Sequence, residues 1–141
     1  MRSFLKLFIF LSLCSLSFFS LSFEIKEGVL RTPDARFENL EDYPFKPNYM
    51  MIEGLRIHYL DEGPKSAEPI ILFHGEPAWS YLFRKMIPVL TEAGYRVVVP
   101  DMVGFGKSDK FESKYDYSYQ HHIETMKELV KKLDLKNATH F

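Results

Sequence analysis

One short stretch, His74-Gly75-Glu76-Pro77, combines residue types that suit a backbone anion site. Gly75 permits a tight backbone path, and Pro77 restricts the residue before it, which directs the Glu76 N–H away from any strand ladder. An amide held in this way can stabilise a developing oxyanion, and losing one such donor typically costs about 3 to 4 kcal/mol of transition-state stabilisation. The sequence therefore predicts an oxyanion hole that uses the backbone N–H of Glu76. The alternative is an ordinary strand-ending turn with a locally packed histidine.

A second polar loop, residues 104–109, follows the apolar run at residues 97–99. Its glycines suggest a dinucleotide loop, but Asp109 stands where a third glycine is required, and no helix with an apolar face starts directly from the loop. We therefore expect the glycines to shape a bend and the polar side chains to satisfy loop amides. A direct catalytic role for Asp101 is the less favoured alternative. The residues expected near the site in a structural role are His74, Gly75, Pro77, Asp101, Gly104, Gly106, Ser108 and Asp109.

The histidines do not form a metal-binding pattern. His121 and His122 are neighbours on an expected helix, so their side chains point about 100° apart. Metal-binding pairs on a helix need a spacing of three or four residues. We expect neither a metal nor a cofactor. The formal charge of -1 is spread without blocks, which argues against nucleic acid or a polybasic membrane patch as a partner.

The elements that must position these loops indicate an α/β fold. Residues 70–73 form a short apolar run bounded by polar turns, as expected for a strand buried on both faces. Residues 79–92 have helical spacing, with Pro88 expected to kink or divide the helix and Gly94 expected to end it. Residues 95–99 predict a second strand. The order of strand, helix and strand predicts a crossover with parallel pairing.

Further elements are predicted on either side of this unit. Residues 50–52 and 55–60 predict an antiparallel pair joined through Glu53-Gly54. Ser118 is predicted to cap a helix, and residues 138–141 resemble the start of another strand. The apolar face of that helix would consist of Ile123, Met126, Leu129, Val130 and Leu133.

The N-terminus has the pattern of a secretory signal peptide. Arg2 and Lys6 lie at the start of a Phe/Leu/Ile-rich run at residues 7–21, and residues 20–22 offer a small-x-small cleavage site. We therefore expect export to the periplasm or the exterior and no membrane span after cleavage, with an uncleaved anchor as the alternative. The mature chain would contain no cysteine, so its stability would come from its core and not from disulfides.

Three segments follow from these patterns. We predict a signal peptide helix over residues 1–22, an irregular N-terminal arm over residues 23–48, and an α/β core over residues 49–141. The arm contains several prolines with aromatic residues between them, which suggests that it lies on the domain surface and buries its rings. An aromatic content of 16% argues against a disordered chain.

Several motifs along the chain can be considered together. They are Arg31-Thr32-Pro33-Asp34, Tyr59-Leu60-Asp61-Glu62-Gly63, His74-Gly75-Glu76-Pro77-Ala78-Trp79-Ser80-Tyr81, Arg84-Lys85-Met86-Ile87-Pro88, Pro100-Asp101 and Gly104-Phe105-Gly106-Lys107-Ser108-Asp109-Lys110. Together they resemble the haloalkane dehalogenases of the α/β-hydrolase superfamily, and the resemblance covers essentially all of the expected mature chain. It implies the N-terminal half of an α/β-hydrolase fold.

The resemblance implies displacement of halide from a small haloalkane by an aspartate carboxylate, followed by hydrolysis of the resulting ester by a histidine-activated water. Glu76 would supply its backbone N–H to the oxyanion hole. Family members bind the leaving halide with tryptophan N–H groups. Trp79, the sole tryptophan, lies at neither of the family's halide-binding positions, so we expect it to pack rather than bind halide.

The family's nucleophile, acid, catalytic histidine and cap helices have no counterpart in these residues. We therefore expect this chain to be a fragment of a longer hydrolase, inactive alone and prone to aggregate through an unpaired strand edge. An epoxide hydrolase or an ester hydrolase of the same superfamily is one alternative, because fold alone does not decide chemistry. A non-catalytic exported binding protein is another. The sequence carries no sign of an oligomeric state.

Overall fold

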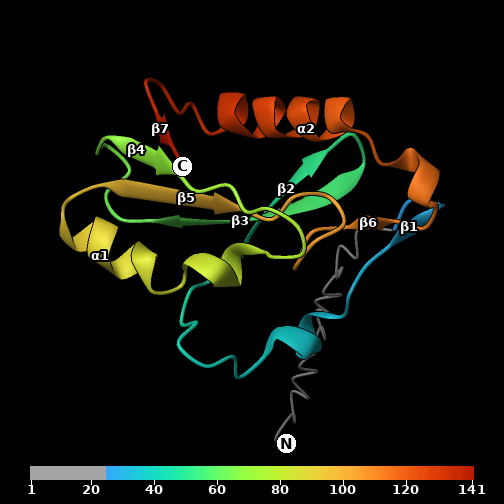
Figure 1. Ribbon diagram of the computed structural model, residues 1–141, viewed down its shortest axis with the longest axis horizontal. Helices are drawn as coiled ribbons and strands as arrows, with labels where there is room; N and C mark the ends of the chain where they lie inside the picture. Colours follow the sequence, from blue (N-terminus) through green and yellow to red (C-terminus); the bar gives the residue numbers. More distant parts are fainter. Residues whose placement is uncertain (1–24) are drawn as a thin grey trace, which may run out of the picture.

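A five-stranded mixed sheet organises the chain (Figure 1), in the order β2-β3-β5-β4-β7. The computed structural model describes residues 25–141. The pairs β2–β3 and β3–β5 are antiparallel, whereas β4 pairs in parallel with both β5 and β7. The strands are β2 (Asn48–Ile52), β3 (Leu55–Glu62), β4 (Pro69–Ile71), β5 (Arg96–Pro100) and β7 (Thr139–His140).

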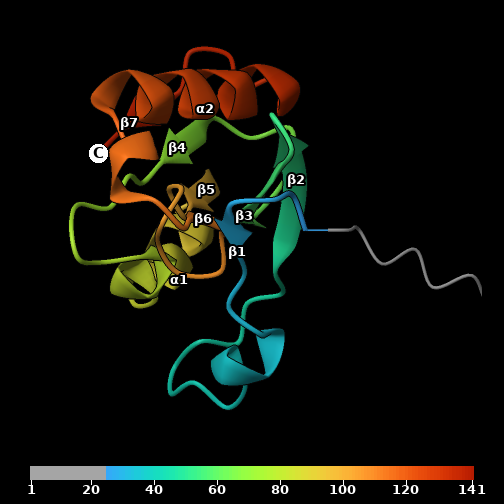
Figure 2. The ribbon, with the colours of Figure 1, turned by 90° about the vertical axis from the view of Figure 1, so that its right-hand side faces the viewer.

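Two α-helices lie on opposite faces of this sheet, as Figures 1 and 2 show from two sides. They are α1 (Met86–Glu92) and α2 (Tyr119–Lys132). The described part of the chain also contains three short 3₁₀ helices: η1 (Asp34–Phe37), η2 (Ser80–Phe83) and η3 (Lys114–Asp116). A second, two-stranded sheet pairs β1 (Val29–Leu30) with β6 (Lys110–Phe111). This small sheet ties the N-terminal arm to the loop that follows β5.

The predicted crossover is confirmed, since β4, α1 and β5 follow one another and the two strands are parallel. Both turn residues between β2 and β3 have positive φ, 52° at Glu53 and 80° at Gly54, as a two-residue hairpin of this kind requires. Ser118 caps α2 by accepting a hydrogen bond from the His121 N–H. The amide of Phe73 donates to the carbonyl of Phe141, so the predicted last strand also pairs beside β4.

The helical stretch predicted for residues 79–92 is divided, but not at Pro88. It breaks between η2 and α1, and Pro88 is the third residue of α1. In the first turn of a helix a residue needs no N–H donor, so proline is tolerated there. Gly94 follows the helix with φ of 92°, which confirms it as the terminating residue.

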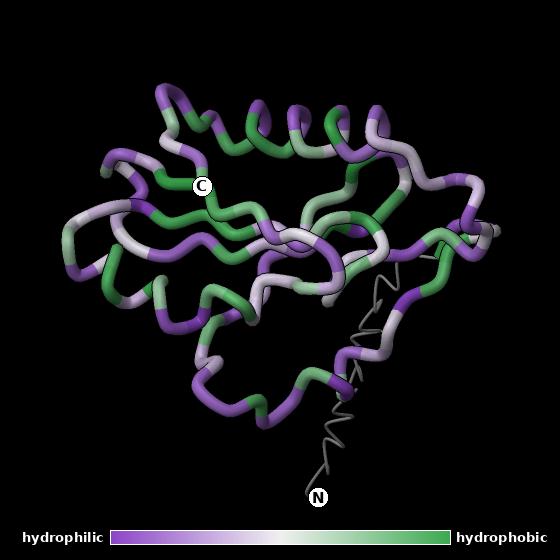
Figure 3. The backbone as a smooth tube through the Cα atoms, in the orientation of Figure 1, coloured by the Kyte–Doolittle hydropathy of each residue, from purple (hydrophilic) through white to green (hydrophobic). Residues whose placement is uncertain are grey.

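The core consists of apolar clusters on the two faces of the sheet. Met126 and Leu129 of α2 pack against β2 and β3 on one face, and Ile87 of α1 packs against β5 on the other. Val97, Val98 and Val99 of β5 are fully buried, as expected for a strand covered on both sides. Figure 3 shows the same arrangement, with hydrophobic strands at the centre and hydrophilic turns around them.

The arm is more ordered than predicted, because it contributes β1 and η1. It does bury aromatic surface, as expected, with Tyr43 only 8% exposed. The predicted signal peptide, residues 1–22, lies outside the described residues, so it remains a prediction. Within residues 25–141, the helices are too short or too polar to cross a membrane.

Candidate functional site

The loop after β4 is fixed at its start by His74, which is 3% exposed. Its Nε2 accepts a hydrogen bond of 3.0 Å from the Met102 N–H, and its ring packs edge-on against Phe105. Because Nε2 is an acceptor, the imidazole proton lies on Nδ1, which is 3.2 Å from the Gly75 carbonyl oxygen. His74 therefore acts as an anchor for the loop and not as an exposed base.

The amide of Glu76 stands in the middle of this loop. The Ala78 N–H donates to the Gly75 carbonyl at 2.9 Å and closes a turn around Glu76 and Pro77, which are joined by a cis peptide bond. Within residues 25–141, the Glu76 N–H has no hydrogen-bond acceptor. The nitrogen lies neither in a helix nor in a strand, so no ladder hydrogen bond engages this N–H.

This loop opens on an apolar groove of about 1050 Å³, which we call the α2 groove. One wall consists of residues 73–76 with Met102 and Phe105, and the other is formed mainly by α2, including His122, Ile123 and Met126. Glu76 is among the residues that line this groove.

The opposite end of the loop is held by Asp101, a carboxylate with no exposed surface. Oδ1 accepts a hydrogen bond from the Ser80 N–H at 2.7 Å, and Oδ2 accepts one from the Lys107 N–H at 2.8 Å. His58 Nδ1 lies 2.8 Å from Oδ2. Burial disfavours the charged form, but these hydrogen bonds outweigh it and hold the pKa of Asp101 below its ordinary value.

Gly106 explains how the glycine-containing loop approaches this carboxylate so closely. Its φ is 46°, and a Cβ at this position would overlap Asp101 Oδ2 and lie 2.9 Å from the Trp79 Cβ. Any side chain here would therefore have to displace the carboxylate. The bend predicted from the two glycines is present, and Gly104 also has a positive φ, of 96°.

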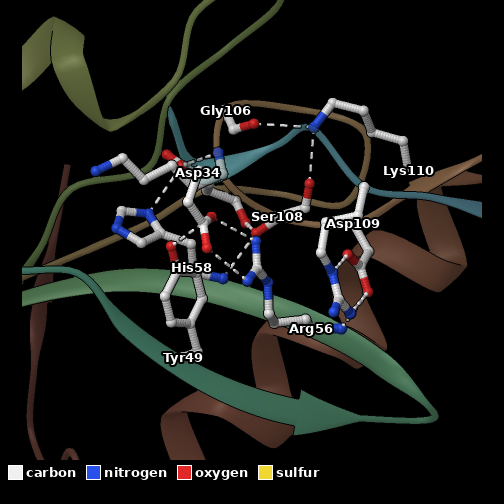
Figure 4. Close-up of polar contacts among 11 residues, drawn as sticks. Asp34, Tyr49, Arg56, His58, Gly106, Ser108, Asp109 and Lys110 are labelled. Atoms are coloured by element: carbon white, nitrogen blue, oxygen red, sulfur yellow. Dashed lines mark hydrogen bonds and ion pairs between the residues drawn. The ribbon is translucent and has the colours of Figure 1, made fainter. Parts of the chain in front are cut away.

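A chain of ion pairs links the arm to this region (Figure 4). Arg31 forms a two-pronged pair with Asp109, with N–O distances of 2.7 and 2.8 Å. Arg56 on β3 pairs with Asp34 on the arm, and its guanidinium lies over the Tyr49 ring. The Arg56 hydrogen bonds lower the pKa of Asp34.

Two expected roles need correction. Ser108 and Asp109 were expected to satisfy amides of their own loop, but each accepts from an amide of β3 instead. The His58 N–H donates to Ser108 Oγ at 2.8 Å, and the Arg56 N–H donates to Asp109 Oδ2 at 2.7 Å. The physical reason is that β3 runs antiparallel to β5. The start of β3, with Arg56 and His58, therefore lies beside the loop that follows β5. Asp101 does accept from the loop amide of Lys107, as expected.

Sequence reasoning missed His58, Tyr43 and Ser80, all of which are buried here. A detectable signal existed for His58, because a polar residue inside an apolar strand needs a buried partner. We call His58, His74, Ser80, Asp101 and Asp109 the strand-end cluster, since they gather where β4 and β5 end.

The strand-end cluster contains an imidazole paired with a carboxylate, but both side chains of the His58–Asp101 pair are 0% exposed. A substrate cannot reach them, so we assign the pair no direct chemistry. Trp79 packs among the rings of Phe37, Tyr43 and Tyr81, at centroid distances of 5.4 to 5.5 Å. Among the described residues, no three His, Cys, Asp or Glu side chains are arranged to hold a metal ion.

Comparison with known proteins gives consistent matches. The profile of the alpha/beta hydrolase fold family matches residues 68–141. A haloalkane dehalogenase of Psychrobacter cryohalolentis is 56% identical over 118 residues, covering 80% of this chain and 39% of that protein. The solved structure of the tetrameric haloalkane dehalogenase DpaA from Paraglaciecola agarilytica has 49% identity and a TM-score of 0.76, covering 79% of this chain and 39% of that one.

A plant epoxide hydrolase, VrEH1 from Vigna radiata, is more distant. It has 25% identity and a TM-score of 0.63, covering 68% of this chain and 31% of that one. The chain thus spans 39% of the length of the dehalogenases that it matches.

Proposed function

The chain belongs to the alpha/beta hydrolase fold family and corresponds to the N-terminal portion of haloalkane dehalogenases. From this premise we propose that it supplies the oxyanion loop of an enzyme that cleaves carbon–halogen bonds in small haloalkanes. The observation that carries the proposal is the Glu76 N–H, which has no acceptor within residues 25–141 and belongs to a loop that lines the α2 groove.

The proposed reaction has two steps. A carboxylate oxygen attacks the carbon that bears the halogen, the carbon–halogen bond breaks, and the halide leaves with the electron pair, which produces an ester. Water then attacks the ester carbonyl while a histidine takes its proton. The negative charge that develops on the carbonyl oxygen is stabilised by the Glu76 N–H. When this intermediate collapses, the bond to the alkyl oxygen breaks, and that oxygen takes the proton from the histidine and leaves as the alcohol. The carboxyl group then loses its remaining proton to the solvent, which restores the carboxylate.

The described residues supply only part of this machinery. The carboxylates of Asp101 and Asp109 in the strand-end cluster are 0% exposed and engaged with neighbouring side chains and amides. His74 and His58 are also buried. We propose that the nucleophile and the base come from polypeptide beyond these 141 residues, and that this chain has no dehalogenase activity alone.

A hybrid protein tests the proposal. Residues 25–141 would be joined to the part of the Psychrobacter cryohalolentis dehalogenase that follows its region of similarity, and halide release from 1-bromobutane would be measured. We expect turnover by the hybrid and none by the 141-residue chain. A folded hybrid without halide release, or a chain that releases halide by itself, would contradict the proposal.

Epoxide hydrolysis is the second candidate, supported by the similarity to the Vigna radiata enzyme. It is less favoured because both identity and TM-score are lower than for the dehalogenase structure. The hybrid does not test this alternative, since its remaining residues would come from a dehalogenase. Expression from the chain's own gene with its natural downstream sequence, assayed with styrene oxide and 1-bromobutane, distinguishes the two functions.

We also propose that the protein is exported, on the basis of the Arg2 and Lys6 charges and the apolar run at residues 7–21. Mass spectrometry of the full chain after expression in a bacterium with a periplasm tests this. Loss of a mass that corresponds to residues 1–22 supports cleavage. An intact N-terminus in the cytoplasm would contradict export.

A further inference from the structure

The N-terminal arm contacts the segment that ends the oxyanion loop. Tyr43 Oη lies 2.7 Å from Ser80 Oγ, and both side chains are buried. The Tyr43 ring also packs against Trp79 and Tyr81, with both centroids 5.5 Å away. The arm is therefore joined to this segment by a buried hydrogen bond as well as by aromatic packing.

Ser80 is held from two directions. Its backbone N–H donates to Asp101 Oδ1 at 2.7 Å, while its hydroxyl meets Tyr43. The other end of the loop is held by the Met102 N–H, which donates to His74 Nε2. Adjacent residues at the end of β5 thus hold both ends of the loop, and Tyr43 supplies an anchor that comes from outside the sheet.

This contact is specific, because neither hydroxyl has an alternative partner among the described residues. Burial raises the pKa of Tyr43, so the phenol stays protonated at neutral pH. A buried hydroxyl that loses its partner is left without compensation for its lost hydration. Removing the hydroxyl of Tyr43 or of Ser80 should therefore increase the mobility of the remaining side chain and of the backbone that carries it.

We propose that Tyr43 is a positioning residue for catalysis: through Ser80 it holds residues 74–80 in the conformation that presents the Glu76 N–H to the reacting oxygen. The arm is then part of the catalytic apparatus, although it touches no reacting atom. This inference rests on the proposed dehalogenase function.

The two-step reaction makes the role measurable. Halide leaves in the first step, in which the carboxylate loses charge. The oxyanion forms only in the second step, when water attacks the ester. A loosened Glu76 amide should therefore slow ester hydrolysis selectively, so that halide is still released in a first burst while the alkylated enzyme accumulates.

The test compares Tyr43→Phe and Ser80→Ala in the hybrid with Tyr81→Phe as the matched control. Tyr81 also bonds the arm, through its hydroxyl to the Glu41 carbonyl at 2.9 Å, but this contact does not involve Ser80. We expect Tyr43→Phe and Ser80→Ala to lower steady-state turnover about tenfold with a full halide burst, because a small displacement of a catalytic group has effects of this order. The double variant should lose no more than either single variant.

Equal effects of Tyr43→Phe and Tyr81→Phe, or a burst that falls together with turnover, would overturn the inference. If even the unaltered hybrid releases no halide, the proposed function fails, and a second measurement on the 141-residue chain still decides the positioning. There, Tyr43→Phe should speed amide hydrogen exchange in residues 74–80 but not in residues 96–100. Unchanged exchange in residues 74–80 would refute the positioning role by itself.

Discussion

The strand-end cluster and the α2 groove lie next to each other but differ in how far the described residues complete them. Asp101 is 0% exposed and accepts hydrogen bonds from two other segments. In contrast, Ile123 on α2, which lines the groove, is 47% exposed. The loop that carries Glu76 is thus fixed by contacts within residues 25–141, whereas the groove has an open apolar wall. Residues 25–141 are thus sufficient to hold the Glu76 amide in place, but they do not enclose the groove.

The largest effect should come from removing the charge at the centre of the cluster. Asp101→Asn keeps the shape of the side chain but places an NH₂ group or a weaker acceptor against the amides of Ser80 and Lys107 and against His58. We expect the free energy of unfolding of the hybrid to fall by about 3 to 5 kcal/mol. Urea denaturation measures this.

Asp134→Asn is the control, because Asp134 is 75% exposed and, among residues 25–141, pairs only with Lys136. Its effect should stay within about 0.5 kcal/mol. Similar losses of unfolding free energy for the two variants would show that the strand-end cluster contributes no more to stability than an exposed ion pair.

Gly106→Ala should have the next largest effect. The new methyl group would overlap Asp101 Oδ2, while Gly28, also with a positive φ of 73°, has nothing within 4 Å of the same methyl position. We expect about 2 to 4 kcal/mol of destabilisation for Gly106→Ala and about 1 kcal/mol for Gly28→Ala. Equal melting temperatures for the two variants would contradict the close approach of this loop to Asp101.

The contribution of Asp101 to the free energy of unfolding should decrease at acidic pH. Burial raises the pKa of Asp101, but hydrogen bonds lower it by more, so the folded-state value lies below the unfolded value of about 3.9. The stabilisation is therefore complete above that pH and is lost as pH falls through the folded-state pKa. Urea denaturation at a series of acidic pH values should show this loss in the hybrid and a smaller one in Asp101→Asn. Parallel pH profiles would exclude Asp101 as a contributor.

The smallest effect is expected on the groove side. In the 141-residue chain, Ile123→Ala should cost less than about 1 kcal/mol, because half of the side chain is already exposed. Leu129, on the same helix and 1% exposed, should cost about 2 to 5 kcal/mol when changed to alanine. Equal losses would mean that the wall at Ile123 is closed and would remove the contrast between the two regions.

Local patterns predicted the elements well because their signals lie within a few residues. Glu53-Gly54 marked the hairpin, Gly94 ended α1, and Ser118 capped α2. Pro88 misled the prediction of the helix break, since its consequence depends on whether it falls in the first turn. That position is set by where the loop before α1 ends, which packing decides.

The long-range polar contacts of the site could not be predicted. The His58–Asp101 pair joins residues 43 positions apart, and it forms because β3 lies beside β5. The residues of β3 and of β5 do not indicate which strand will lie beside them. Tyr43 and Ser80 meet for a similar reason, since the path of the arm depends on aromatic packing. The loop at residues 74–77 was detectable because its proline acts on the adjacent backbone. The expected need for Gly75 is not met, because Gly75 has no positive φ and an added Cβ there would meet nothing within 4 Å.

The most direct test of the account removes the Glu76 N–H without changing any side chain. In the hybrid, residue 76 would be replaced by the α-hydroxy analogue of glutamate, which substitutes an ester oxygen for the amide nitrogen. The same replacement at Ala67, whose N–H donates to the Pro64 carbonyl in a surface turn, controls for the ester linkage. We predict that steady-state halide release falls about 100- to 1,000-fold while the first-turnover burst persists. Unchanged turnover with the ester at residue 76 would show that this amide is not an oxyanion donor.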